Sequence, residues 1–311
     1  MAIFYYLIFY SAAVIFVSAC LVRIRRYART PLHLRWEVYP IPHEEPARAK
    51  HGGSRFEEVD WWTKPARRNL AGELKFMIPE MLLLKGLRDF NRRLWYRSFP
   101  FHFGLYLLAG TITLLMAGAA ALILAPASGP HAFVRIIQIL YPVTGAAGLA
   151  LAIPGACGLL ALRIRDESLR ACTAPGDRFN LLFFIVTLSV LAAALMLKSA
   201  SAPNMLEITR GMLTFDTGLR IPALLGAGLV LAALLAAYIP LTHMSHFIAK
   251  YFTYHSVRWD DAPNRRGSDM EKRMAEYLAY RPTWAAAHVG ADGRKTWAEI
   301  AAAGPAAGAK K

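Results

Sequence analysis

Long apolar segments alternate with charged segments along the whole chain. Five of the apolar segments approach or exceed the ~20 residues that cross the hydrocarbon core of a bilayer. They are residues 3–21, 101–124, 132–162, 179–197 and 221–241. The pattern therefore predicts an all-α fold, an integral membrane bundle of five transmembrane helices.

The charged segments divide the chain into four parts. Residues 1–22 form a first transmembrane anchor, 23–100 a basic cytoplasmic loop, 101–241 the transmembrane helices two to five, and 242–311 a cytoplasmic tail. An uncleaved anchor is favoured over a signal peptide because no positive charge precedes the first apolar segment.

Both the loop and the tail carry helical patterns. In residues 65–97, leucine and methionine alternate with arginine and lysine, which predicts an amphipathic helix on the anionic lipids of the inner leaflet. Pro79 is expected to break this helix in two, and a helix packed under a partner subunit fits the same pattern. Ser268 and Glu271 have the spacing of a capping box, so we expect a short tail helix ending near residue 280.

Composition agrees with a membrane protein and excludes other classes. The chain is 56% hydrophobic and 18% charged, whereas a soluble domain carries about 25% charged residues. A secreted disulfide-rich domain, a disordered tail and a plain cytosolic enzyme are excluded. The net charge of +15 first suggests a nucleic-acid partner, but basic loops of a membrane protein set its orientation. We therefore expect no nucleic acid.

The basic residues are concentrated in alternate connections. Residues 23–97 hold 17 Lys and Arg, residues 163–178 hold 4, and the segment after residue 241 holds 11, which together are 32 of the 36. The positive-inside rule places these segments in the cytoplasm. The N-terminus is then outside and the C-terminus inside.

The three cysteines, Cys20, Cys157 and Cys172, form no CxxC motif and have no metal-ligand spacing. They map to the cytoplasmic side or close to it, where disulfides are not expected. We expect no iron–sulfur cluster in this chain, so such a centre must belong to a partner.

Histidines at the ends of two spans are the strongest candidates for a cofactor site. His102 enters the second span from the cytoplasm, and His243 and His246 follow the fifth. Antiparallel spans put all three at one membrane depth, and two facing imidazoles are what a six-coordinate haem b needs. The alternative is that these histidines simply lie in the interfacial region.

We expect the iron ligands to be His102 and His246, with His243 in contact with a haem propionate. His243 and His246 are three residues apart and can share one helical face. Gly104 is expected to let the porphyrin approach the backbone, and the small residues Ala109, Gly110, Ala117 and Gly118 to allow close helix packing. The five histidines of the loop and tail are expected to be solvated or at protein contacts; they are His33, His43, His51, His255 and His288.

One haem is expected, because neither span carries a further histidine deeper in the bilayer; a second haem is not excluded. His131, Arg135 and Gln138 share one face at the outer end of the third span. Such a row suits the carbonyl oxygens of a quinone headgroup, and a capped helix start explains it equally well. A quinone site nearer His102 is more economical.

Three sequences resemble those of a known family. They are FHFG at residues 101–104, THMSHF at 242–247 and KYFTYHSVRWDD at 250–261. They look like cytochrome b subunits related to the respiratory nitrate reductase gamma subunit. With KTWAEI at 295–300, the closer likeness is to the branch of sulfate and metal reducers that has a heterodisulfide-reductase-like iron–sulfur partner.

The resemblance implies electron transfer between a menaquinone-type quinone and that cytoplasmic iron–sulfur subunit, through haem b, in a bacterial or archaeal cytoplasmic membrane. That family has a second histidine pair for a distal haem, and here residues 110–112 and 226–228 take its place. The alternative function is a redox-inactive membrane anchor that recruits the partner. A transporter is less favoured because no internal repeat is visible and few charges are buried.

Overall fold

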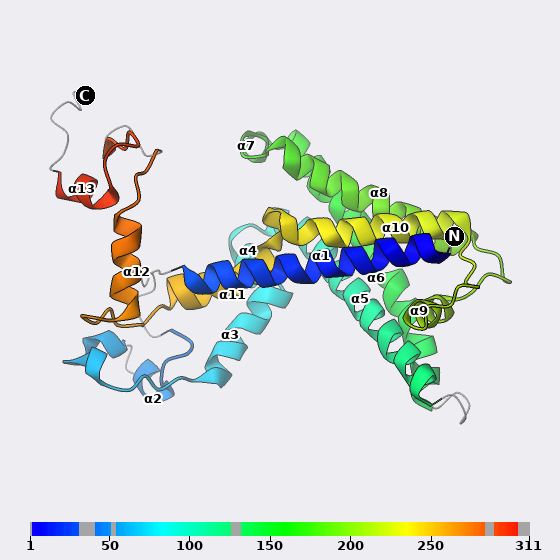
Figure 1. Cartoon of the computed structure of the whole chain (residues 1–311), viewed down its shortest axis with the longest axis horizontal. Coiled ribbons are helices and arrows are strands. Elements are labelled where there is room, and N and C mark those ends of the chain that lie inside the picture. Colours follow the sequence, from blue (N-terminus) through cyan, green and yellow to red (C-terminus); the bar gives the residue numbers. More distant parts are fainter. Residues whose placement is uncertain (1, 31–40, 51–53, 126–131, 284–288, 304–311) are drawn as a thin grey trace. The chain divides into compact units, whose positions relative to one another are not determined.

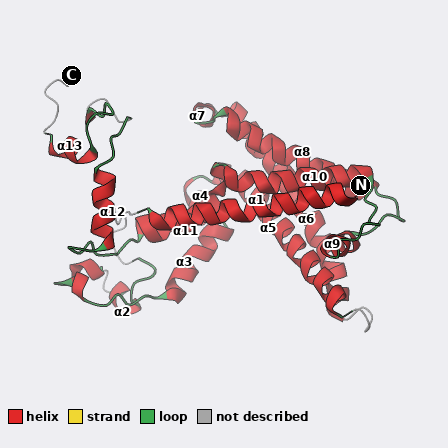
Figure 2. Cartoon of the chain, in the orientation of Figure 1, coloured by secondary structure: helices red, strands yellow, loops and turns green. Residues whose placement is uncertain are grey.

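The computed structural model describes residues 2–30, 41–50, 54–125, 132–283 and 289–303. Within these ranges every regular element is a helix (Figure 2). The chain forms two compact units. The first comprises Met1–Leu21 and Leu70–Ser245, and the second Val22–Asn69 and His246–Lys311. The predicted all-α fold is confirmed.

Five helices of the described chain are long and apolar enough to cross a membrane, as predicted (Figure 1). They are α1 (Ala2–Arg29), α5 (Arg92–Leu124), α6 (Ala132–Arg165), α8 (Pro175–Leu197) and α10 (Ala223–Tyr238), which continues as the 3-10 turn η4 (Ile239–Leu241). Large apolar side chains remain exposed along them, as a lipid-facing surface requires.

The core of the first unit is formed by side chains from α5, α6, α8 and α10. Phe101 of α5 meets Phe184 of α8 edge to face, with ring centroids 5.1 Å apart. Leu149 of α6 and Leu235 of α10 belong to the same buried cluster. These contacts fix the start of α5, where His102 lies, against the body of the bundle.

Glycines allow α5 and α6 to pack closely. A Cβ on Gly104 would lie 2.6 Å from the backbone nitrogen of Ala152, and one on Gly155 would lie 2.5 Å from that of Phe101. The expectation that Gly104 faces a porphyrin is therefore wrong, because α6 occupies that side. Of the predicted small packing residues, Gly118 meets Ile137, whereas no atom lies within 4 Å of a Cβ on Gly110.

The first span is held by hydrogen bonds from its tyrosines. Tyr6 donates to the carbonyl oxygen of Gly211 at 3.2 Å, and Tyr10 donates to that of Met212 at 3.0 Å. Both acceptors belong to α9 (Met205–Leu213), a short helix between α8 and α10.

The amphipathic segment forms α3 (Leu70–Leu82) and α4 (Lys85–Phe90), and its last residues open α5. The predicted break at Pro79 is wrong, since α3 runs through this proline. The chain turns instead at Leu84, which has a φ of +51°. Glu80 stabilises this turn because its Oε2 accepts the N–H of Gly86 at 2.8 Å.

The second unit joins the first half of the loop to the tail. Its helices are α2 (Pro46–Ala49), α11 (His246–Thr253), α12 (Asp269–Leu278) and α13 (Trp297–Ala302), with 3-10 turns η1 (Arg55–Glu57) and η2 (Trp61–Thr63) and a π-helical turn η6 (Tyr254–Arg258). Trp259 is fully buried at its centre. The predicted tail helix is α12, and Ser268 caps it by accepting the N–H of Glu271 at 3.2 Å.

Candidate functional site

The imidazole of His102 is oriented by the preceding turn of α5. Its Nδ1 lies 2.7 Å from the carbonyl oxygen of Ser98 and 3.3 Å from the Ser98 hydroxyl. A carbonyl can only accept, so the ring carries its proton on Nδ1 and a lone pair on Nε2. Histidines that ligate metals through Nε2 are commonly held in this way.

His243 lies in the 3-10 turn η5 (His243–Ser245) and contacts the start of α8. Its Nε2 is 3.0 Å from Oδ1 of Asp177 and 3.3 Å from Nδ2 of Asn180. Asn180 is only 6% exposed, and its Oδ1 accepts the hydroxyl of Tyr238 at 2.9 Å. Both of these contacts involve Nε2 of His243. The expected contact of His243 with a haem propionate stays a prediction.

His102 and His243 lie at the same end of the first unit. Arg93, at the start of α5, pairs at 2.9 Å with Asp166, just after α6. Asp177, which contacts His243, also lies 3.7 Å from Arg163 near the end of α6. The start of α5, the end of α6 and the start of α8 therefore meet at one end, together with the turn that follows α10.

His246 is the first residue of α11 and is exposed. It belongs to the second unit, whereas His102 and His243 belong to the first. His243 and His246 do not share one continuous α-helix, since the 3-10 turn η5 ends at Ser245. The pairing of His102 with His246 remains a prediction.

The predicted quinone row of His131, Arg135 and Gln138 is described only in part. His131 lies outside the described residues. Arg135 and Gln138 are both exposed on α6, and Val134 and Ile137 between them are buried. The two polar residues thus share the outward face of the helix, as their spacing predicts.

Residues 226–228 of α10 pack closely against other helices of the first unit, and Thr111 of α5 contacts α6. The ring of Tyr5 from α1 occupies the space that a side chain on Gly226 would need. A Cβ on Gly228 would lie 3.1 Å from Cα of Leu191 in α8. On α5, Thr111 Oγ1 lies 2.8 Å from Thr144 Oγ1 of α6.

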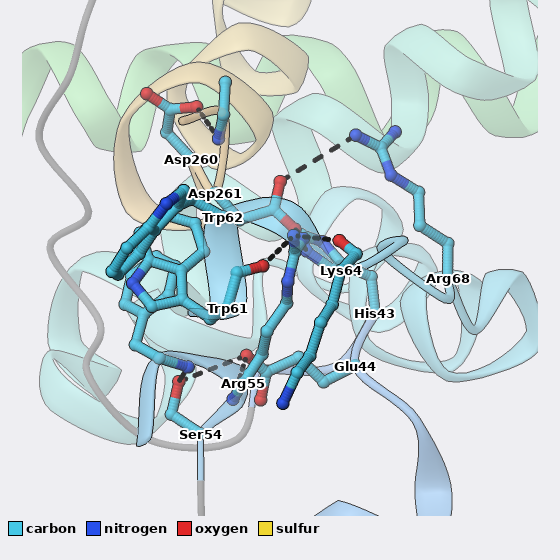
Figure 3. Close-up of polar contacts among 12 residues, drawn as sticks. His43, Glu44, Ser54, Arg55, Trp61, Trp62, Lys64, Arg68, Asp260 and Asp261 are labelled. Carbon is cyan, nitrogen blue, oxygen red and sulfur yellow. Dashed lines mark hydrogen bonds and ion pairs between the residues drawn. The ribbon is translucent and has the colours of Figure 1, made fainter. Parts of the chain in front are cut away.

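A buried polar cluster in the second unit is a feature that sequence reasoning missed (Figure 3). Asp261 lies at its centre, with Oδ2 3.2 Å from Nη1 of Arg55 and 3.7 Å from Nε2 of His43. Its other oxygen is 3.9 Å from Arg68. Burial raises the pKa of the Asp261 carboxyl, but the hydrogen bond and charge of His43 and the charges of Arg55 and Arg68 outweigh it, so the pKa is lowered overall.

Other contacts of the cluster lie within the loop or join the loop to the tail. Arg55 donates to the carbonyl oxygens of Trp61 and Lys64 at 3.2 and 3.1 Å. The ring of His43 meets that of Trp259 edge to face, with centroids 5.6 Å apart. His43 is only 4% exposed, so of the two expected environments, solvent or protein contacts, it is at protein contacts.

A cavity of about 220 Å³ adjoins this cluster. Four cationic and four acidic side chains line it with His43, namely Arg48, Arg55, Lys64, Arg67, Glu44, Glu45, Glu58 and Asp261. The cationic and acidic side chains are equal in number, so the lining carries no excess charge of one sign from these eight residues.

In the described part of the chain, no three His, Cys, Asp or Glu residues are grouped so as to hold a metal ion. A haem needs only two axial ligands, so this does not bear on the histidine pair. Comparisons with protein-family models, with curated proteins and with solved structures find no match to this chain.

Proposed function

We propose that the protein is the haem b subunit of a membrane redox complex. It passes electrons between membrane quinone and a cytoplasmic iron–sulfur subunit of the heterodisulfide-reductase-like kind. The observation that carries this proposal is the orientation of His102, whose Nδ1 donates to the Ser98 carbonyl oxygen at 2.7 Å and so fixes the tautomer in which Nε2 is the ligating nitrogen.

Two histidines are assigned as the haem ligands. His102 provides one axial nitrogen from a half-buried position on an apolar span. We assign the second to His246 from the sequence pattern, because Nε2 of His243 is already bound by Asp177 and Asn180. When bound, haem b supplies one-electron transfer at a fixed position.

The protein's own part is to orient the ligand and exclude water. The Ser98 carbonyl oxygen fixes the His102 tautomer. Phe101, next to His102, is buried against Phe184, which limits solvent near the ring. The packing of Tyr5 on Gly226 supports a single haem, since the ring of Tyr5 occupies the space that a side chain at this position of α10 would need.

Quinone and the partner subunit complete the proposed path. Arg135 and Gln138, with His131, remain the outer candidate for a quinone headgroup. Exposed aromatic side chains of the tail, among them Tyr280 and Trp297, offer docking contacts for the iron–sulfur subunit.

The test is a reduced-minus-oxidised absorbance spectrum of the purified full-length protein. A b-type band, with about one haem per chain by extraction, is the expected result. A protein without this band is not a haem carrier, and the proposal fails.

A redox-inactive anchor is the second candidate, and one observation favours it. The loop and tail are packed into one compact unit around the buried Asp261, as a docking platform requires. Absence of the band combined with copurification of a soluble iron–sulfur protein would establish this function in place of the first.

A further inference from the structure

The end of the first unit that holds His102 carries a second set of chemically active groups. We infer that His243, held by Asp177, is the proton acceptor and donor for a quinone headgroup. The quinone would bind where α8 begins and α10 ends. This inference rests on the proposed function and assigns its quinone site to that end rather than to the His131 row.

The first argument is the pairing of His243 with Asp177. A carboxylate only accepts hydrogen bonds, so the 3.0 Å contact places the proton of the neutral ring on Nε2. The lone pair is then on Nδ1, which makes no hydrogen bond with the described residues. When Nδ1 takes a proton, the charge of Asp177 stabilises the imidazolium. An aspartate supports general-base histidines in this way.

The second argument is that the surroundings of the ring are fixed. Oδ2 of Asp177 accepts the N–H of Ala174 at 2.9 Å, which leaves Oδ1 for His243. The amide nitrogen of Asn180, 3.3 Å from Nε2, is itself a donor and is therefore a neighbour of the protonated Nε2 and not a second partner; the Oδ1 of this amide accepts the hydroxyl of Tyr238. These contacts come from α8 and α10, so the ring position is set by two spans.

The third argument is that the His243 ring and a neighbouring group of aromatic rings are both exposed. The His243 side chain is 64% exposed, so its ring can exchange protons with water. Phe179, which lies between Asp177 and Asn180 in the first turns of α8, is 54% exposed. Phe179 and Phe183 each lie 5.8 Å from the ring of Tyr238. These three rings form an aromatic surface on which a flat quinone ring can stack.

Three charged or titratable side chains of the described residues belong to the contacts around His243. Asp177 lies on α8, Arg163 of α6 is 3.7 Å from Asp177, and Tyr238 lies on α10. Asp177 is the only anion among them, so the imidazolium form of His243 has one specific counter-ion.

The reaction balances through these groups. Oxidation of one quinol breaks two O–H bonds and releases two electrons. Each proton passes in turn to Nδ1 of His243, which returns it to water before accepting the next. The haem that His102 and His246 would hold would accept the electrons one at a time. Quinone reduction runs the same steps backwards.

The experiment uses the full-length protein with its haem and follows haem reduction after mixing with a soluble naphthoquinol, at several pH values. His243→Gln removes the proton acceptor, and Asp177→Asn keeps the shape of the partner but removes its charge. His255→Gln is the matched control, because that histidine lies in the second unit. The dithionite-reducible band measures the haem content of every variant.

We expect the wild-type rate to rise with pH across the range in which imidazoles titrate. His243→Gln should slow haem reduction at least about tenfold and remove that rise, Asp177→Asn should slow it by a smaller factor, and His255→Gln should change neither. A full-haem His243→Gln protein with the wild-type rate and pH profile would overturn the inference. If His243→Gln loses haem, an unchanged rate in Asp177→Asn overturns it instead. A wild-type protein without a b-type band ends the proposed function and this inference together.

Discussion

The Nδ1 atom of His102 lies 2.7 Å from the carbonyl oxygen of Ser98, one turn earlier in α5. This contact belongs to the backbone of Ser98, so it does not depend on the serine side chain. It sets the tautomer of the histidine that we propose as an iron ligand.

His102→Ala should therefore abolish the b-type absorbance band, because the iron loses an axial nitrogen. Ser98→Ala is the matched control, since it removes the hydroxyl at 3.3 Å but keeps the carbonyl oxygen. The spectrum of each purified variant checks both expectations. A band that persists in His102→Ala would move the ligand to His131 or to a histidine of the loop.

His246→Ala should convert a six-coordinate low-spin haem into a five-coordinate high-spin one, since a single imidazole would remain. The position of the Soret band and electron paramagnetic resonance report the spin state. His255→Ala should leave both unchanged. If the His246→Ala haem stays low-spin, the second ligand is another residue, with His243 the first to be tested.

Asp261→Asn should destabilise the second unit by about 2 kcal/mol, because it removes the anion that faces Arg55 and His43 in a buried position. Limited proteolysis of the tail and thermal unfolding in detergent measure the loss. Asp292→Asn is the control, since that aspartate is exposed in the tail. Equal proteolysis of the two variants would show that the Asp261 cluster does not hold loop and tail together.

The five spans could be predicted from the sequence because each is a local property: some twenty apolar residues in a row. The Asp261 cluster could not, because its members come from segments about 200 residues apart along the chain and follow no period. The only local sign was a histidine and two tryptophans in a loop otherwise rich in charge and proline.

Gly104 shows a different limit of prediction from the sequence. Its lack of a side chain correctly indicated a close approach, but the sequence does not say to what, and α6 rather than a cofactor lies there. At Pro79 the sequence predicts a break, but α3 continues through the proline. A folded bundle can accommodate a proline that an isolated helix does not favour. The contact of His243 with Asp177 also joins distant residues, and its only sequence signal was their common position at span ends.

Stability of the second unit should fall in acid because of Asp261. Its pKa is lower in the folded chain than in the unfolded one, where an aspartate titrates near about 3.9. The stabilisation is therefore complete above that value and is lost as the pH falls through it toward the folded-state pKa. Protease resistance of the tail should be constant from about pH 7 to 5 and decline below about pH 4. In Asp261→Asn the decline should be smaller, and an equal decline would assign the acid sensitivity to other carboxyls.

Gly104→Ala should destabilise the first unit by about 1–3 kcal/mol, because the added methyl group overpacks the contact between α5 and α6. Its Cβ would meet backbone atoms of Ala152 and Gly148 at 2.6 and 2.7 Å, and backbone cannot move aside as a flexible side chain can. Gly110→Ala, on the same helix, has no atom within 4 Å of its Cβ and should be neutral or slightly stabilising, since alanine favours helix more than glycine does. Thermal unfolding of the two variants in detergent gives the comparison. If both behave alike, the two spans do not pack through Gly104, and that face of α5 becomes available to a cofactor after all.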